Sequence, residues 1–273
     1  MNPKFNNKLN NKNKNKCYKT LNEFKNEINC VYNKKNKESI YLLHDFKLDI
    51  SEWDDEEKKL YEEGKKNINE NNIEIYINNK KIKFNYEYES NEVGQIKVKF
   101  KFKKLLTFTN HMFLGCYFLE SIDLSSFNVN NVISISGMFY GCSSLKSIDL
   151  SSFNTNNVTN MRNMFRGCSS LKSIDLSSFK TNKVTDISSM FRGCSSLKSI
   201  DLSSFNTSNV TDMSSIFNGC SSLKSIDLSS FNTNRVTDMS IMFWGCSSLK
   251  KENVRLNENE NKILDQLPLE SDH

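Results

Sequence analysis

Cysteine is the most regularly spaced reactive residue in this sequence. Six of the eight cysteines recur at intervals of 26 residues, at Cys116, Cys142, Cys168, Cys194, Cys220 and Cys246. A zinc site needs several ligands that converge, usually from C-x-x-C pairs. Here each cysteine of the row stands alone, and Ser-Ser follows five of them. We therefore interpret the row as small buried packing groups, with metal or redox chemistry as the weaker alternative.

Aspartate and serine form a second regular set. The candidate binding residues are Asp123, Asp149, Asp175, Asp201 and Asp227, with Ser147, Ser173 and Ser199 two positions before three of them. They alternate with isoleucine and leucine, which is the spacing of the outward side of a short strand. A solvated face is one interpretation. The functional interpretation is a polar recognition surface for a basic peptide, a cation or a glycan, although tryptophan, tyrosine and arginine are absent from these rows.

The histidines do not suggest catalysis. His44, His111 and His273 are scattered, and the chain has no Ser-His-Asp order, glycine-rich phosphate loop or paired-carboxylate setting. We expect no enzymatic activity, no cofactor and no bound metal.

The 26-residue unit that carries both rows can be interpreted position by position. Leu145, Ile148 and Leu150 follow an L-x-x-I-x-L pattern that predicts a short strand. A polar turn follows at residues 154–157. Apolar residues between 158 and 165 then recur at intervals of three to four, which predicts about two turns of helix in every unit. A fixed period of this length is typical of a solenoid, in which each unit stacks on its neighbours.

The repeat also resembles a known family. The residues that carry the resemblance are Asn209-Val210-Thr211-Asp212-Met213, Phe217-x-Gly219-Cys220-Ser221-Ser222-Leu223 and Ile226-Asp227-Leu228. They are similar to leucine-rich repeats, and more closely to the BspA-type branch with its 26-residue surface-protein or lipoprotein-type repeats. The resemblance covers about residues 105–250. It implies an α/β right-handed solenoid with a parallel strand sheet and short helices, used as a binding scaffold, often at a cell surface, with no shared catalytic residues.

Outside the repeat, the sequence predicts three further regions. Residues 1–16 are rich in asparagine and lysine and are expected to be disordered. Residues 17–104 form an α+β N-terminal region and cap, residues 105–250 the solenoid, and residues 251–273 a C-terminal cap and tail with a small closing helix.

Within the N-terminal region, residues 17–70 are interpreted as partly helical, with a helix over residues 53–66 that packs on the cap. Residues 73–88 predict a hairpin, because apolar residues alternate on both sides of Asn78-Asn79. A third strand, over residues 96–102, lies 26 residues before the first strand of the repeat. We expect it to act as a zeroth unit.

Composition bounds location and partners. The net charge is +5, and the chain has neither an apolar run long enough to span a membrane nor a signal peptide. We expect a cytoplasmic chain as given, since a surface location would require unconventional export or a truncated N-terminus. The expected function is a non-catalytic scaffold for protein–protein or surface-type interaction, with an unknown protein partner or a polar or cationic ligand and no nucleic acid. The alternative is a structural or adhesive array that binds glycan or cation weakly and multivalently.

Overall fold

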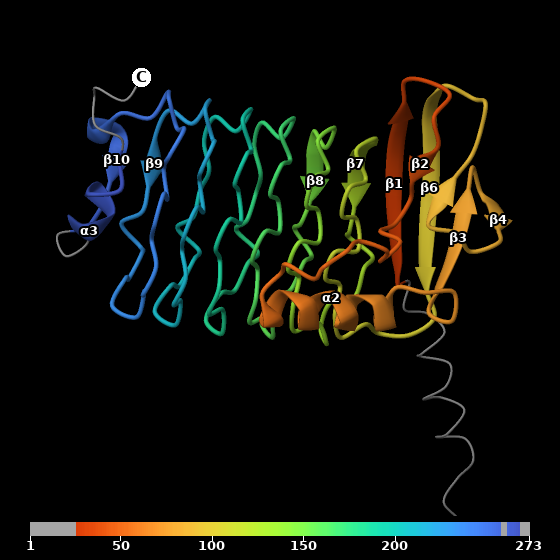
Figure 1. The fold of residues 1–273 in the computed structure, drawn as a ribbon, viewed down its shortest axis with the longest axis horizontal. Helices are drawn as coiled ribbons and strands as arrows, with labels where there is room; N and C mark the ends of the chain where they lie inside the picture. Colours follow the sequence, from red (N-terminus) through yellow and green to blue (C-terminus); the bar gives the residue numbers. More distant parts are fainter. Residues whose placement is uncertain (1–25, 258–260, 268–273) are drawn as a thin grey trace, which may run out of the picture.

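The computed structural model describes residues 26–257 and 261–267. The predicted disordered tail, residues 1–16, lies outside them. The fold is mixed α/β, mostly sheet with few helices, and it contains a six-stranded mixed sheet followed by stacked 26-residue units (Figure 1). In the order β4-β3-β6-β1-β7-β8, the strands of the sheet are Lys80–Ile82, Ile73–Ile77, Gly94–Phe102, Glu27–Lys34, Leu119–Asp123 and Ser147–Asp149.

The predicted third strand is present, and the hairpin predicted over residues 73–88 is present over residues 73–82 only. Strands β3 and β4 pair antiparallel around Asn78 and Asn79, whose φ angles are 47° and 67°. Two consecutive left-handed residues make the tight turn that matches the twist of a hairpin, and asparagine tolerates this conformation. Strand β6 pairs antiparallel with β3 and buries alternate residues, as its period-two pattern predicts.

Strand β1 corrects two predictions. It lies in a region interpreted as partly helical, yet Ile28, Cys30 and Tyr32 are buried on one side of an extended strand. It also lies between β6 and β7 and pairs antiparallel with both. The prediction that β6 acts as a zeroth unit is therefore wrong. Strand β1, not β6, pairs with the edge of β7 that would otherwise have unpaired backbone groups.

Helix α2 (Asp55–Asn67) confirms the helix predicted over residues 53–66. It begins after Asp54, whose side chain accepts a hydrogen bond from the N–H of Glu57. Its position differs from the prediction, because it does not pack on the cap alone. Figure 1 shows α2 lying across several adjacent units. The preceding segment contributes β2 (Ile40–Tyr41), which pairs with β5 (Glu87–Tyr88).

The prediction of a short helix in every unit, at residues 158–165 and their equivalents, is wrong. Each segment is a series of turns, joined to the next unit by parallel bridges at residues 108, 134, 160, 186, 212 and 238. The N–H of Phe139 donates to the carbonyl of Met164 at 2.9 Å rather than to a carbonyl four residues earlier in its own unit. Asn163, Ser189, Ser215 and Ile241 share one position in successive units and have φ angles of 49–59°. A left-handed residue there interrupts any right-handed helix.

The predicted strand in every unit is found only in part. Strands β7 and β8 pair in parallel, and β9 (Ile226–Asp227) pairs in parallel with β10 (Val254–Arg255). The units between β8 and β9 have no assigned strand, yet their leucines and phenylalanines are buried. Phenylalanines 113, 139, 165, 191, 217 and 243 stack with ring centroids 5.6–5.9 Å apart. The turn-side hydrogen bonds and this aromatic ladder hold the units together.

The C-terminal end follows the sequence expectation. A 3₁₀ turn (Lys251–Asn253) precedes β10, so that Val254, not Glu252, pairs with Ile226. The predicted closing helix appears as α3 (Asn261–Leu264). No helix in the described part of the chain is long and apolar enough to cross a membrane.

Candidate binding face

The predicted binding residues share one exposed face, defined here as the Asp/Ser face. Its members are Asp123, Asp149, Asp175, Asp201, Asp227, Ser147, Ser173 and Ser199, and all are exposed. The parallel pairing of β7 with β8 sets Asp123 directly beside Asp149. Farther along the row, the charges of Asp175 and Asp227 both act on Asp201. The face is therefore a line of neighbouring carboxylates.

Each aspartate of this face also closes a turn. Its Oδ1 accepts the backbone N–H of the serine two residues later, at 2.9 Å in all five units. Hydrogen bonds from the N–H and hydroxyl of that serine lower the pKa of Asp149, Asp175, Asp201 and Asp227. At Asp149 and Asp201, these hydrogen bonds outweigh the repulsion from neighbouring aspartates, which acts to raise the pKa. The Asp-x-Ser spacing of an Asx turn was a signal for this structural role.

A hollow of about 560 Å³ lies at the N-terminal end of the face. Asp123, Ser147 and Asp149 line it together with Lys97 and Lys99 of β6. The structure thus brings three predicted residues beside lysines that the sequence interpretation assigned to the cap. At the other end, Asp227 Oδ2 lies 3.5 Å from Arg255 Nη1, so the acidic row runs between basic groups.

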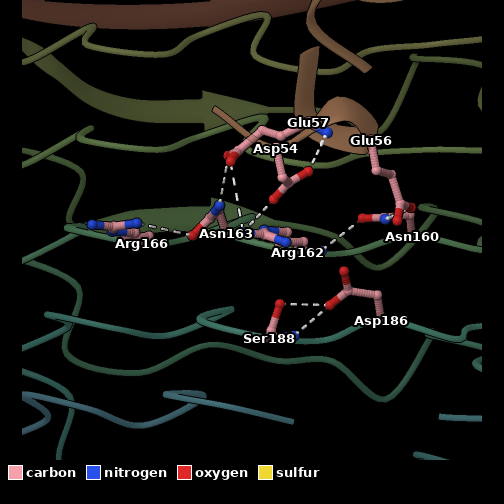
Figure 2. Close-up of polar contacts among 9 residues, drawn as sticks. All are labelled: Asp54, Glu56, Glu57, Asn160, Arg162, Asn163, Arg166, Asp186 and Ser188. Carbon is pink, nitrogen blue, oxygen red and sulfur yellow. Dashed lines mark hydrogen bonds and ion pairs between the residues drawn. The ribbon is translucent and has the colours of Figure 1, made fainter. Parts of the chain in front are cut away.

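The turn side of the stack is the side that contains the bridged residues 108, 134, 160, 186, 212 and 238. It carries a polar contact with α2, drawn in Figure 2. Arg162 Nη2 lies 3.2 Å from Asp54 Oδ2 and 3.6 Å from Glu57 Oε2, at the start of the helix. The amides of Asn160 and Asn163 donate to Glu56 and Glu57 at 3.2 and 3.1 Å. These contacts tie the acidic first turn of α2 to the third unit.

A second hollow, of about 340 Å³, was missed by the sequence interpretation. It lies between the segment that precedes α2 and the first two units. Its aromatic walls are Tyr41, Trp53, Tyr117 and Tyr140, and Asp45 also lines it. The signal was Tyr117, which stands where the later units have serine.

Comparison with known proteins places the repeat in a family. The family model described as "Mycoplasma protein of unknown function, DUF285" matches residues 83–175 and 172–266, which together are more than half of the chain. This chain belongs to the DUF285 family. The two consecutive matches support the predicted repeat nature of the chain. No match is found among curated proteins or among solved structures.

The cysteine row of this DUF285 chain lies in the core. From Cys142 onward, each thiol donates to the carbonyl of a phenylalanine in the preceding unit, as Cys142 does to Phe113 at 3.2 Å. Burial raises the pKa of all six thiols. Cys30 of β1, for which the sequence suggested no role, is buried next to the row. Among the described residues, no group of three or more His, Cys, Asp or Glu side chains is arranged to hold a metal ion.

Two of the histidines are buried beneath α2. His44 Nε2 lies 3.0 Å from the Tyr61 hydroxyl. His111 is fully buried, and neither of its ring nitrogens has a hydrogen-bond partner. Burial lowers the pKa of His44 to about 4 and that of His111 to about 3, so both rings are neutral at pH 7. His273 lies outside the described residues.

Proposed function

We propose that this DUF285 chain is a non-catalytic scaffold for protein–protein interaction, built as a leucine-rich-repeat-like solenoid of the BspA type. The 26-residue period, the parallel bridges between units and the phenylalanine ladder support this architecture. A stack of this kind presents the same side chain at regular intervals on a rigid surface. Such a surface suits recognition of an extended partner.

The proposed partner surface is the Asp/Ser face, and the proposed partner is a basic polypeptide segment. One observation carries the proposal: five exposed carboxylates stand in line, and four of them have pKa values lowered by fixed hydrogen bonds. Charge in a row steers and orients an oppositely charged partner more than it tightens binding. Binding should therefore be modest and sensitive to salt.

The test compares two double variants that remove equal charge from different faces. Asp175→Asn/Asp201→Asn alters the Asp/Ser face, whereas Asp212→Asn/Asp238→Asn alters the turn side. All four aspartates accept an N–H from the serine two residues later, and asparagine retains that acceptor. A fluorescent pentalysine peptide is titrated by anisotropy at low and at physiological salt.

We expect the first variant to weaken pentalysine binding by about three- to ten-fold at low salt, and the second to change it less than two-fold. If both variants weakened binding equally, the peptide would respond only to the net charge of the protein, and the Asp/Ser face would not be a specific partner surface. Unchanged binding by the first variant would reject the face as a partner surface.

A further inference from the structure

The aromatic hollow combines exposed rings with a break in the repeat. Tyr117 is 55% exposed and Tyr41 is 42% exposed. At the position of Tyr117, the later units have Ser143, Ser169, Ser195, Ser221 and Ser247. The stack therefore does not require an aromatic residue at this position. An exposed tyrosine there, beside Leu48 and Trp53, makes an apolar surface of the kind that marks binding sites.

The walls of the hollow are held in place by their neighbours. The ring centroid of Trp53 lies 5.4 Å from that of Tyr61 and 5.7 Å from that of His111. The guanidinium of Arg166 lies over the ring of Tyr140, 4.8 Å from its centroid. The surface thus already holds one cation against an aromatic face.

Charge favours a basic occupant. Residues 44–57 carry seven acidic side chains and one lysine, and three of the acidic ones, Asp54, Glu56 and Glu57, already contact the third unit. Four acidic side chains therefore remain against one lysine. Asp45 lines the hollow itself, and its ion-pair partner Lys47 is 79% exposed. Because the lysine of this pair is solvent-exposed, the ion pair is weak and the half-buried Asp45 carboxylate can exchange partners.

We infer that this hollow binds the arginine or lysine side chain of a basic peptide segment in a protein partner. The aromatic rings supply the cation–π surface, and Asp45 supplies the opposite charge. The volume of about 340 Å³ suits one long side chain with its flanking backbone. Tyrosine, tryptophan and arginine are also the residues that dominate interface energetics, and the Asp/Ser face lacks them. This site is separate from that face and does not depend on it.

The chain offers a clean optical reporter for the test. It contains two tryptophans, Trp53 in the hollow and Trp244, which is 68% exposed in the last unit. Asn218 fills the Trp244 position one unit earlier, so Trp244→Asn leaves Trp53 as the sole reporter in a protein that should fold normally. The probes are acetyl-Leu-Arg-Leu-amide and the same peptide with neutral citrulline in place of arginine.

Trp53 fluorescence should titrate with the arginine peptide and saturate below about 10 mM. In the Trp244→Asn protein, Tyr117→Ser should raise the Kd by about five-fold or more, and citrulline should do the same. Serine fills this position in the later units, so the fold should be retained, and a thermal melt checks this. Tyr140→Arg is a second variant taken from the repeat itself, since Arg166 occupies that position in the next unit. It should repel the cation.

Several results would overturn the inference: no saturation, equal binding of the citrulline peptide, or a Kd that neither Tyr117→Ser nor Tyr140→Arg changes. The double variant Asp175→Asn/Asp201→Asn separates this site from the Asp/Ser face. It should leave the Kd within about two-fold. A larger loss in that variant would place the peptide on the Asp/Ser face and reject the hollow.

Discussion

Asp186 is buried, whereas Asp212 and Asp238 occupy the same position in later units and are more exposed. Burial raises its pKa to about 6, despite hydrogen bonds from the N–H and hydroxyl of Ser188. A carboxyl with a raised pKa in the folded state stabilises the fold only when protonated, and that contribution is lost as the pH rises from about 4 to above 6. The ionised side chain therefore costs folding free energy at neutral pH.

Asp186→Asn should stabilise the protein at pH 8. Asn160 fills this position one unit earlier, and its Oδ1 still accepts the N–H two residues on. The gain should be about 1–3 kcal/mol at pH 8 and should shrink toward zero at pH 4. Urea unfolding at both pH values measures it. A gain that did not depend on pH would contradict this account.

His111 gives the opposite kind of pH dependence. Its pKa is lowered to about 3, so the folded state disfavours the proton that the unfolded chain binds near pH 6.5. The stability present above pH 6.5 is therefore lost progressively as the pH falls toward 3. His44, whose pKa is lowered to about 4, acts in the same direction.

His111→Phe should reduce the loss of unfolding free energy between pH 7 and pH 5 by about 1–2 kcal/mol. Phenylalanine suits the site because neither ring nitrogen of His111 has a hydrogen-bond partner. Only the difference between the two pH values is compared, since the left-handed φ of 58° at this residue adds a constant cost. Equal losses in both proteins would show that His111 is not a source of the acid sensitivity.

At the scale of elements, α2 is held across the stack by close backbone approach as well as by charge. Asn110 donates to the carbonyl of Leu60 at 2.9 Å, and Gly64 faces the same residue. A Cβ at Gly64 would lie 2.5 Å from the Asn110 carbonyl oxygen and 3.1 Å from Phe46. The helix can lie this close to the first unit only because Gly64 has no side chain.

Gly64→Ala should therefore destabilise the protein by about 1–3 kcal/mol, although alanine is the better helix former by about 1 kcal/mol. Chemical denaturation measures the change. The control is Glu62→Ala on the exposed side of the same helix, which should stay within about 0.5 kcal/mol of wild type. A stabilised Gly64→Ala protein would mean that α2 can move away from the stack at little cost.

At the scale of the whole molecule, the stack should tolerate loss of one complete period. Deleting Leu171 to Ser196 removes 26 residues and brings equivalent positions together. The phenylalanine ladder and the turn-side bridges would stay in register, and α2 would keep its contacts with Asn160, Arg162 and Asn163. We expect a shorter folded protein with a somewhat lower melting temperature.

The control deletion removes half a period. Losing 13 residues from the same point places polar residues at core positions and should abolish the cooperative melt. Circular dichroism and thermal unfolding compare the two proteins. If both deletions were tolerated equally, the units would not need to stack in register on their neighbours, which would contradict the observed architecture.

The sequence alone determined the features that follow from spacing. The 26-residue period identified the stacking unit and its buried residues, including the Cys142 and Phe139 rows. Alternation around Asn78-Asn79 identified the hairpin, and the helix expected over residues 53–66 is α2. These signals are local, because a side chain's place on a strand or helix follows from its position along the chain.

Only the tertiary structure decided which groups face one another across long separations. The short apolar spacing of residues 158–165 fits a helix, but the neighbouring units offer carbonyls to the same N–H groups, so turns bonded to the next unit form instead. At the left-handed position of each unit, Gly137 is the one glycine from Gly137 to Ile241, and Asn163, Ser189, Ser215 and Ile241 adopt the same conformation without one. Strand β1 lies beside β7 because the first strand of a stack leaves an unpaired edge that another segment can cover. Helix α2 covers the turn side from the first unit, at Asn110, to the third, at Asn160. The aromatic hollow exists only where that covering segment meets Tyr117 and Tyr140.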